Sequence, residues 1–344
     1  MPLSSKTHEP WPADTSCRGD VFRPLKRLTW YRLLRHLRKR RDKRALVCPE
    51  LAYDCRGQEA SDRIGALLAN PGPCMIARFG NNELRTVENH LSIQAPGSLW
   101  ERIDRYLKGE SGPWWWDDRT SREMRLGAGF FPATPANFER FARLTLEDSR
   151  QIDVLGSWLP AERLLSGQLN AVRVPMIDLE PYFHENPWSE MLCDRTVLVI
   201  HPFEKSIRNQ YKKRKTLFKD PRVLPDFNLL TFPSVQSIGG DCSRFADWFE
   251  ALDWMKQQIT AIDFDVALIG AGAYGMPLAA FIKRDLGRKA VHLGGATQIL
   301  FGIKGRRWDQ RLAYSKGLYN QEWTRPLEEE TPAKASRVEG GCYW

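Results

Sequence analysis

The sequence lacks the cysteine patterns that form a disulfide framework or a zinc knuckle. Its seven cysteines are scattered, odd in number and never spaced as CxxC. Secreted domains that depend on disulfides carry an even number of cysteines at short spacings. The cysteines therefore predict a reducing compartment, and we expect a cytoplasmic protein, either free or attached peripherally to a membrane.

Long apolar runs are also missing. The longest, Val266 to Ile282, is shorter than the roughly 20 residues that a helix needs to span a bilayer, and Pro277 and several glycines interrupt it. Residues 1–20 are polar and contain prolines, unlike a secretory signal. We therefore expect neither a transmembrane helix nor a signal peptide.

Acidic residues are nearly absent from residues 21–44, which contain eleven Lys or Arg and one acid, Asp42. The formal net charge of +9 is therefore concentrated in this segment. Apolar residues recur every three or so positions from Leu25 to Leu37, which predicts a basic amphipathic helix. Such a helix suits an anionic membrane surface, or it packs on the body with its basic face in solvent. Nucleic acid is not expected, because the rest of the chain adds no basic excess.

Two glycine turns in residues 262–309 organise the rest of the chain. The apolar run Val266–Ile269 predicts a buried strand, a helix that tolerates Pro277 in its first turn follows, and Ala290–Leu293 predicts a second strand. The candidate ligand-binding residues of these turns are Gly270, Gly272, Tyr274 and Gly275 after the first strand, and His292, Gly294 and Gly295 after the second.

A right-handed crossover places both turns at one edge of a parallel sheet. Backbone N–H groups and a helix N-terminus at that edge suit an anionic ligand, and Lys304 and Arg307 follow within reach. A dinucleotide dehydrogenase would need an Asp or Glu at the end of the second strand, where His292 stands, so NAD is disfavoured. The plain alternative is a tight strand-to-helix turn without a ligand.

Polar residues follow three other predicted strands. Cys74–Ala77 runs into Arg78, Gly80, Asn81 and Glu83, which either face a ligand or cap the next helix. His201 and Lys205 follow Val197–Ile200 and either meet a phosphate or have a structural role. Asp178 and Glu180 follow Val172–Ile177 and either share a metal ion or cap a helix.

Taken together, these stretches resemble the GT-D-fold glycosyltransferase superfamily, and more narrowly a poorly characterised branch of it. The similar text covers roughly residues 60–344 and includes RFGNNEL, GAGFFP, DVLGSW, DLEPYF, VLVIHPF, WFEALDWM, ALIGAGAYGMPLAAFIK, HLGGATQILFGIKGRRW and EGGCYW. The resemblance implies an α/β fold with a doubly wound, mainly parallel Rossmann-like sheet and helices on both faces. We therefore divide the chain into a disordered, basic helical extension, residues 1–44, and an α/β domain, residues 45–344.

The resemblance also implies transfer of a hexosyl group from a nucleoside-diphosphate sugar to a carbohydrate, lipid-linked or protein acceptor. The family holds Mg²⁺ or Mn²⁺ on the diphosphate with a D-x-E motif, and the matching positions here are Asn81-Asn82-Glu83. Asn81 removes one charge, which weakens metal binding. Arg78, Asn81 and Glu83 are the candidate catalytic residues.

Three outcomes stay open at this position. Glu83 and Asn81 hold the metal, or Glu83 binds donor hydroxyls while Lys304 and Arg307 neutralise the diphosphate, or the protein binds a nucleotide sugar without transferring it. Asp178 and Glu180, a literal D-x-E at another place in the chain, are the second choice for the metal.

Overall fold

The computed structural model describes residues 30–38, 51–237, 244–332, 335 and 341–344. The chain forms two compact units, which we treat separately. The first unit comprises Met1–Leu46 and Ser98–Glu110, and the second comprises Val47–Gly97 and Ser111–Trp344.

Two helices make up the described part of the first unit. Residues 30–38 are helical, and the remainder of the predicted basic extension lies outside the described residues. Helix α4 (Leu99–Lys108) begins at Ser98, which forms a reciprocal capping box with Glu101. Leu34 is buried, and the guanidinium of Arg38 lies 4.7 Å from the ring centroid of Tyr106. The two segments therefore pack on each other although about sixty residues separate them.

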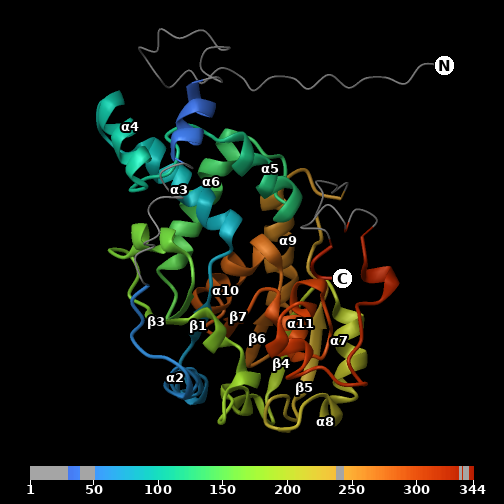
Figure 1. Cartoon of the computed structure of the whole chain (residues 1–344). Helices are drawn as coiled ribbons and strands as arrows, with labels where there is room; N and C mark the ends of the chain where they lie inside the picture. Colours follow the sequence, from blue (N-terminus) through green and yellow to red (C-terminus); the bar gives the residue numbers. More distant parts are fainter. Residues whose placement is uncertain (1–29, 39–50, 238–243, 333–334, 336–340) are drawn as a thin grey trace, which may run out of the picture. The chain divides into compact units, whose positions relative to one another are not determined.

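The second unit contains one seven-stranded sheet in which every pairing is parallel (Figure 1). The order across the sheet is β3-β2-β1-β7-β6-β4-β5. The strands are β1 (Cys74–Ala77), β2 (Val154–Ser157), β3 (Val172–Pro175), β4 (Thr196–Ile200), β5 (Asn228–Phe232), β6 (Val266–Ile269) and β7 (Lys289–His292). The prediction of an α/β fold with a mainly parallel, Rossmann-like sheet is confirmed.

Helices of the second unit connect these strands, and short 3-10 turns occur between them. The helices are α2 (Gln58–Ala69), α3 (Asn81–Gln94), α5 (Asp118–Gly127), α6 (Pro135–Ser149), α7 (Glu204–Tyr211), α8 (Arg214–Leu217), α9 (Trp248–Thr260), α10 (Gly275–Arg284), α11 (Ala296–Leu300), α12 (Arg306–Asp309) and α13 (Leu312–Ser315). The 3-10 turns are η1 (Pro160–Leu165), η2 (Met176–Leu179), η3 (Pro181–Phe183), η4 (Trp188–Leu192), η5 (Gly272–Tyr274) and η6 (Glu328–Glu330).

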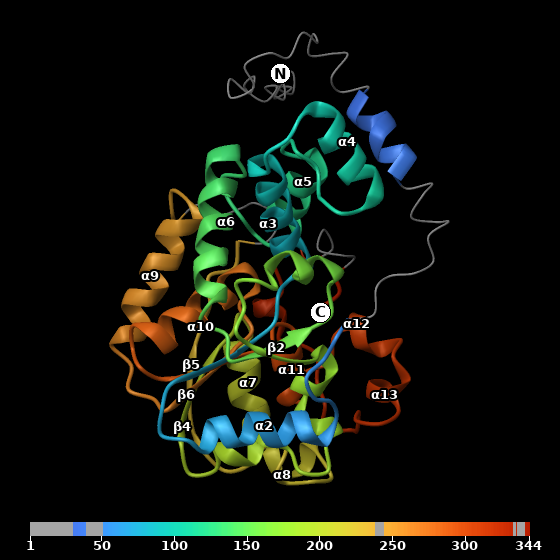
Figure 2. The same ribbon diagram turned by 90° about the vertical axis from the view of Figure 1, so that its left-hand side faces the viewer.

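Alternate residues of the strands point into two separate cores. Along β6, Ala267 and Ile269 pack with α3, α6, α9 and α10, whereas Val266 and Leu268 pack with α2, α7 and α11. Side chains of a strand alternate between the faces of its sheet, so the two cores lie on opposite faces. Figure 2 shows α6 and α9 toward one side of the strands and α2 and α8 toward the other.

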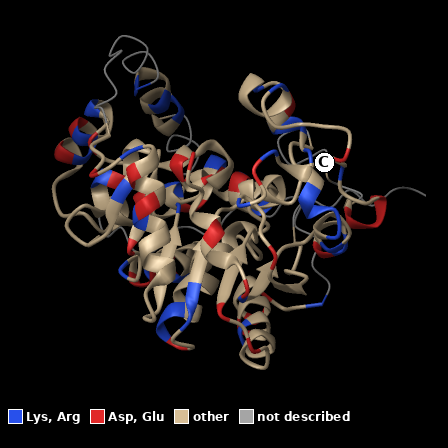
Figure 3. Ribbon diagram, turned by 90° about the horizontal axis from the view of Figure 1, so that it is seen from below, with Lys and Arg blue, Asp and Glu red and all other residues tan. Residues whose placement is uncertain are grey.

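Charged residues are distributed over the helices of the second unit, with Lys and Arg interspersed among Asp and Glu (Figure 3). Within the described ranges, every helix is too short or too polar to span a bilayer.

The sequence-based boundaries are correct for β1 and β6, differ by one residue for β7 and β4, and fail at one edge. β1 and β6 begin and end where the apolar runs predict. β3 stops at Pro175, and the 3-10 turn η2 follows it, so the strand predicted as far as Ile177 is too long. Pro175 has no N–H to continue a ladder, and β3 is an edge strand, where a proline is tolerated.

β7 sends its chain to one face of the sheet, and its two neighbours, β1 and β6, send theirs to the opposite face. After β1 and β6 the chain enters α3 and α10 on one face, and after β7 it enters α11 on the other. Such a divergence opens a crevice beyond the carboxyl ends of parallel strands, which is where ligands bind in open α/β sheets.

Candidate functional site

The carboxyl ends of β1, β7, β6 and β4 lie level with one another. The register pairs Ile76 with Val291, Ile269 with His292, and Ile200 with Ile269. The residues that follow these strands therefore meet at one edge and line a cavity of about 1170 Å³, counting the space at its open mouth.

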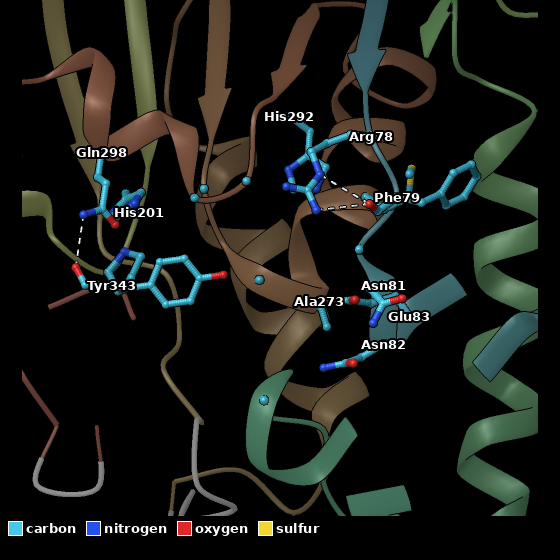
Figure 4. A pocket seen from close by; sticks show the side chains of 18 of the residues that line it. Arg78, Phe79, Asn81, Asn82, Glu83, His201, Ala273, His292, Gln298 and Tyr343 are labelled. Atoms are coloured by element: carbon cyan, nitrogen blue, oxygen red, sulfur yellow. Dashed lines mark hydrogen bonds between the residues drawn. The ribbon is translucent and has the colours of Figure 1, made fainter. Parts of the chain in front are cut away.

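Most of the residues proposed from the sequence line this cavity, which we call the main cavity (Figure 4). They are Arg78, Gly80, Asn81, Glu83, His201, Gly270, Gly272, His292, Gly294, Gly295 and Arg307. In Figure 4, Gln298, His201 and Tyr343 form one group, apart from Asn81, Asn82 and Glu83 at the start of α3. Residues from distant parts of the sequence thus converge on one site.

Two lysines proposed as phosphate ligands do not line the main cavity. The Lys205 ammonium lies 3.2 Å from Oε1 of Glu329. The Lys304 ammonium lies 5.5 Å from the ring centroid of Tyr319, and the Lys304 backbone N–H donates to the Thr324 carbonyl. Backbone pairing with the segment around Thr324 holds Lys304 away from the strand ends.

Tyr274 and Gly275 also lie behind the cavity wall. The ring of Tyr274 is 2 % exposed and stacks on Trp248 with a centroid separation of 4.8 Å. Its hydroxyl lies 3.3 Å from the hydroxyl of Ser237. Tyr274 therefore belongs to the core beneath the turn.

The glycines of the first turn make room for imidazole rings of this protein. A Cβ atom at Gly270 would lie 2.4 Å from Cδ2 of His201, and one at Gly275 would lie 2.1 Å from Cε1 of His292. Both distances are shorter than van der Waals contact. These two glycines therefore serve the packing of histidines, whereas Gly272, with φ +53, has open space around it.

Both histidines are neutral near pH 7. Burial lowers the pKa of His201 to about 3, and burial together with the Arg78 charge lowers the pKa of His292 to about 3. His201 Nδ1 accepts from the Phe203 backbone N–H at 2.9 Å, which puts the His201 proton on Nε2. His292 Nδ1 donates to the Ile269 carbonyl at 3.2 Å, so its Nε2 carries a lone pair. Neither ring supplies a positive charge to a phosphate.

Arg78 supplies a positive charge at the end of β1. Its Nε and one terminal nitrogen donate to the Phe79 carbonyl at 3.3 and 3.2 Å, and its guanidinium lies 5.1 Å from the ring centroid of Trp158. Burial lowers the pKa of Arg78 from its ordinary value, but an arginine stays protonated in proteins. A Cβ at Gly294 would approach this guanidinium to 3.3 Å, so the second glycine turn leaves space for Arg78.

Arg307 supplies a second charge and is held by residues 341–344. Its terminal nitrogens donate to the Tyr343 hydroxyl at 3.2 Å and to the Cys342 sulfur at 3.3 Å. Gln298 Nε2 donates to the Tyr343 carbonyl at 3.1 Å, which fixes the same segment from another side. Tyr343 and Trp344 line the main cavity as a result.

Trp158, Gln298 and Tyr343 are lining residues that sequence reasoning missed as site residues. Their stretches, DVLGSW, HLGGATQ and EGGCYW, carry the family resemblance, and that is the signal that could have pointed to them. Trp158 directly follows the end of β2, so a strand-end pattern could also have marked it, whereas Tyr343 lies in a segment with no regular strand or long helix and has no such signal.

Helix α3 points its N-terminus into the main cavity. Gly80 is the N-cap and has no side chain to satisfy the first N–H groups. Asn81 and Asn82 occupy the first helical turn and line the cavity, and Glu83 follows them. The Glu83 carboxylate folds back toward Gly80. A Cβ atom added at Gly80 would lie only 2.0 Å from Oε2 of Glu83.

The donor groups at Asn81 and Glu83 fit a resident divalent cation poorly. One carboxylate and one amide fall short of the six or more oxygens that such an ion takes, so diphosphate oxygens and water would have to complete the set. In the part of the chain that the structure describes, no three His, Cys, Asp or Glu side chains lie close enough to hold a metal ion.

The carboxylates of the second-choice pair, Asp178 and Glu180, make two separate structural contacts. Asp178 Oδ2 accepts from the Gly57 backbone N–H at 2.7 Å, at the start of α2. Glu180 accepts from the hydroxyls of Tyr182 and Tyr314. The 3-10 turn η2 ends between these two acids, and each carboxylate serves a different structural contact.

Comparisons with known proteins do not extend this description. A scan against protein-family models finds no match, and comparisons with curated proteins and with solved structures find no significant similarity.

Proposed function

We propose that this chain is a glycosyltransferase that takes a hexosyl group from a nucleoside-diphosphate sugar. The observation that carries the proposal is that Arg78 and Arg307 line one cavity together with the N-terminus of α3 and the glycine turn before α10. Guanidinium groups and helix N-termini are the groups that bind phosphates in proteins. The resemblance to the GT-D-fold superfamily names the reaction that would use such a site.

In the proposed reaction, an acceptor hydroxyl oxygen forms a bond to the anomeric carbon and gives up its proton to water. The bond between the anomeric carbon and the diphosphate oxygen breaks, and its electron pair leaves with the diphosphate. Arg78 and Arg307 stabilise the negative charge as it develops, in a site where the low dielectric strengthens the interaction. The neutral imidazoles of His201 and His292 add hydrogen-bonding groups and no charge. None of these steps requires a metal ion.

The position of His292 also supports a nucleoside diphosphate over NAD. A dinucleotide-binding unit places an acid at the end of its second strand to bind the ribose. Here the neutral ring of His292 stands at the end of β7 and covers Gly275. The site therefore offers counter-charges to a diphosphate and no carboxylate to a ribose at this strand end.

The test is thermal unfolding with UDP, GDP, ADP or CDP, their sugar conjugates, and NAD. A ligand at about 100 times its dissociation constant stabilises the native state by roughly 2.7 kcal/mol, which raises the melting temperature by on the order of 5 °C for a chain of this length. We expect such a shift with one nucleoside diphosphate and a small one with NAD.

Two variants tie that shift to the proposed residues. Replacing Arg78 and Arg307 together by Ala should remove most of the shift. Lys304→Ala is the matched control and should leave it unchanged, because Lys304 does not line the main cavity. A shift with NAD alone, or one that survives the double replacement, would contradict the proposal.

A nucleotide-sugar-binding protein without transferase activity is the second candidate. Asn81 favours it, because this residue stands where the family has an acid. A thermal shift with a nucleotide sugar, without hydrolysis or transfer in the presence of Mn²⁺, Mg²⁺ or EDTA, would support this second function.

A further inference from the structure

A second cavity adjoins the main cavity and shares part of its wall. Both are lined by Arg78, Asn81, Trp158, Gly295 and Arg307. The second cavity, of about 1040 Å³ with its open mouth, extends past these residues to Glu180 and Arg311. A ligand in one cavity would therefore lie beside a ligand in the other.

Positive charge exceeds negative charge in this second cavity. Its lining includes the guanidinium groups of Arg78, Arg307 and Arg311 and, among the described residues, one carboxylate, that of Glu180. That carboxylate is 5 % exposed and accepts from the Tyr314 hydroxyl at 2.9 Å. Burial raises the pKa of Glu180, which reduces its value as a counter-charge.

We infer that the second cavity is a subsite for an oxyanion, a phosphate or carboxylate group, bound at Arg311 and Arg307 beside the donor diphosphate. The assignment of this oxyanion to the acceptor rests on the proposed function. If the oxyanion belongs to the acceptor, the acceptor is an anionic molecule. Its charged group enters the second cavity while its hydroxyl faces the main cavity across the shared wall.

The probe is inorganic phosphate, titrated into full-length protein saturated with the nucleoside diphosphate that gives the largest thermal shift. We expect a further, saturable shift that potassium chloride at equal ionic strength does not produce. Arg311→Ala should weaken phosphate binding by about tenfold, as for loss of one charge-assisted contact. Arg306→Ala is the matched control, because Arg306 is an exposed neighbour that lines neither cavity.

The outcomes separate the subsite from the proposed function. If no nucleoside diphosphate binds, but phosphate alone binds and depends on Arg311, the subsite stands and the glycosyltransferase proposal fails. Absence of saturable phosphate binding, with or without nucleotide, would overturn the subsite. Equal losses in Arg311→Ala and Arg306→Ala would also overturn it, because the binding would then follow surface charge alone.

A different observation concerns the first unit alone. Its described residues number 22, and among them five large apolar side chains are at least two-fifths exposed. They are Trp30 (44 %), Leu33 (46 %), Leu37 (42 %), Leu99 (45 %) and Trp100 (76 %). Several large apolar side chains exposed on one small unit are typical of an interaction surface.

The charges around these side chains identify the partner. On the helix of residues 30–38, the exposed apolar side chains recur at three- and four-residue steps and so share one face, and Arg32 and Arg35 lie on the opposite face. In α4, Arg102 and Arg105 lie away from the face of Trp100, and Asp104, one turn after Trp100, pairs with Lys108. An apolar helix face that carries an indole ring, opposite a basic face, favours the interface of an anionic bilayer. We propose that the first unit docks on an anionic membrane, with Leu99 and Trp100 of α4 entering the interface.

The test measures co-sedimentation of the full chain with phosphatidylcholine vesicles, with and without phosphatidylserine. We expect binding that requires phosphatidylserine and weakens as salt rises. Trp100→Ala should reduce the partition coefficient by about tenfold, since burying one large apolar side chain contributes that much or more. Leu312→Ala is the matched control, because Leu312 is 65 % exposed in the second unit.

Three results would overturn the docking proposal. The first is that Trp100→Ala binds vesicles as the wild type does. The second is that the wild type binds equally well to vesicles without phosphatidylserine. The third is that the wild type does not bind vesicles and light scattering shows dimers that Trp100→Ala abolishes, in which case the surface contacts a second copy of this chain.

Discussion

The neutral state of His292 predicts a specific dependence of stability on pH. Its ring is 5 % exposed at the end of β7, and its pKa is lowered from 6.5 to about 3. In the unfolded chain the ring takes up a proton below pH 6.5, whereas in the folded chain it does not. The stabilisation is therefore complete above pH 6.5 and is lost as the pH falls toward 3.

The magnitude follows from these two pKa values. Between pH 7 and pH 5, the proton taken up by the unfolded chain at His292 lowers the free energy of unfolding by about 2 kcal/mol. Asp148 acts in the opposite sense, because burial raises its pKa from 3.8 to about 6 and favours its protonated folded form. A total pH profile therefore mixes several groups, and the contribution of His292 has to be isolated by replacement.

The assay is urea unfolding of the wild type and of His292→Gln at pH 7 and pH 5. His292→Gln lowers the free energy of unfolding at both pH values, because the hydrogen bond to the Ile269 carbonyl is lost or altered. The quantity compared is therefore the change in the free energy of unfolding between pH 7 and pH 5 within each protein. The wild type should lose about 2 kcal/mol more than His292→Gln between the two pH values. His36→Gln, at an exposed position of the first unit, is the control and should match the wild type.

Equal losses in the wild type and in His292→Gln would refute the reasoning. The ring would then be protonated or well solvated in the folded chain, and it could act as a cation toward a phosphate. That result would change the assignment of charge in the main cavity, which at present rests on Arg78 and Arg307.

Other replacements test the glycine turn and the start of α3. Gly275→Ala should lower the free energy of unfolding by about 1–3 kcal/mol, because its Cβ would lie 2.1 Å from the ring of His292. Gly167→Ala has nothing within 4 Å and should change it by less than about 0.5 kcal/mol, measured by urea unfolding; equal effects would contradict the packing argument. Glu83→Gln should reduce nucleotide-sugar hydrolysis by at least about tenfold with the melting temperature unchanged, and retention of a third of the activity would remove Glu83 from the site. Asn81→Asp should raise Mn²⁺ affinity in calorimetric titrations with the nucleoside diphosphate present, and an unchanged affinity would argue against a metal at this position.

The local pattern of the sequence was sufficient for the inner strands β1 and β6 and for the edge where the site lies. Apolar runs bounded by glycine, such as those before Arg78 and Gly270, predicted β1 and β6 with correct ends. The reason is physical, because a strand buried on both faces reads as a continuous apolar run and a parallel sheet gathers its strand ends at one edge. Arg78, Gly294 and Arg307 were proposed from that rule alone and line the main cavity.

The tertiary structure decided what each residue does at that edge. Sequence spacing placed Lys304 as close to the strand ends as Arg307, but pairing with Thr324 carries Lys304 away, and residues 341–344 hold Arg307 in place. The sequence also suggested that Gly270 and Gly275 admit a ligand, whereas packing fills their space with His201 and His292. Such outcomes depend on contacts between segments far apart in the chain, which no local period or spacing encodes.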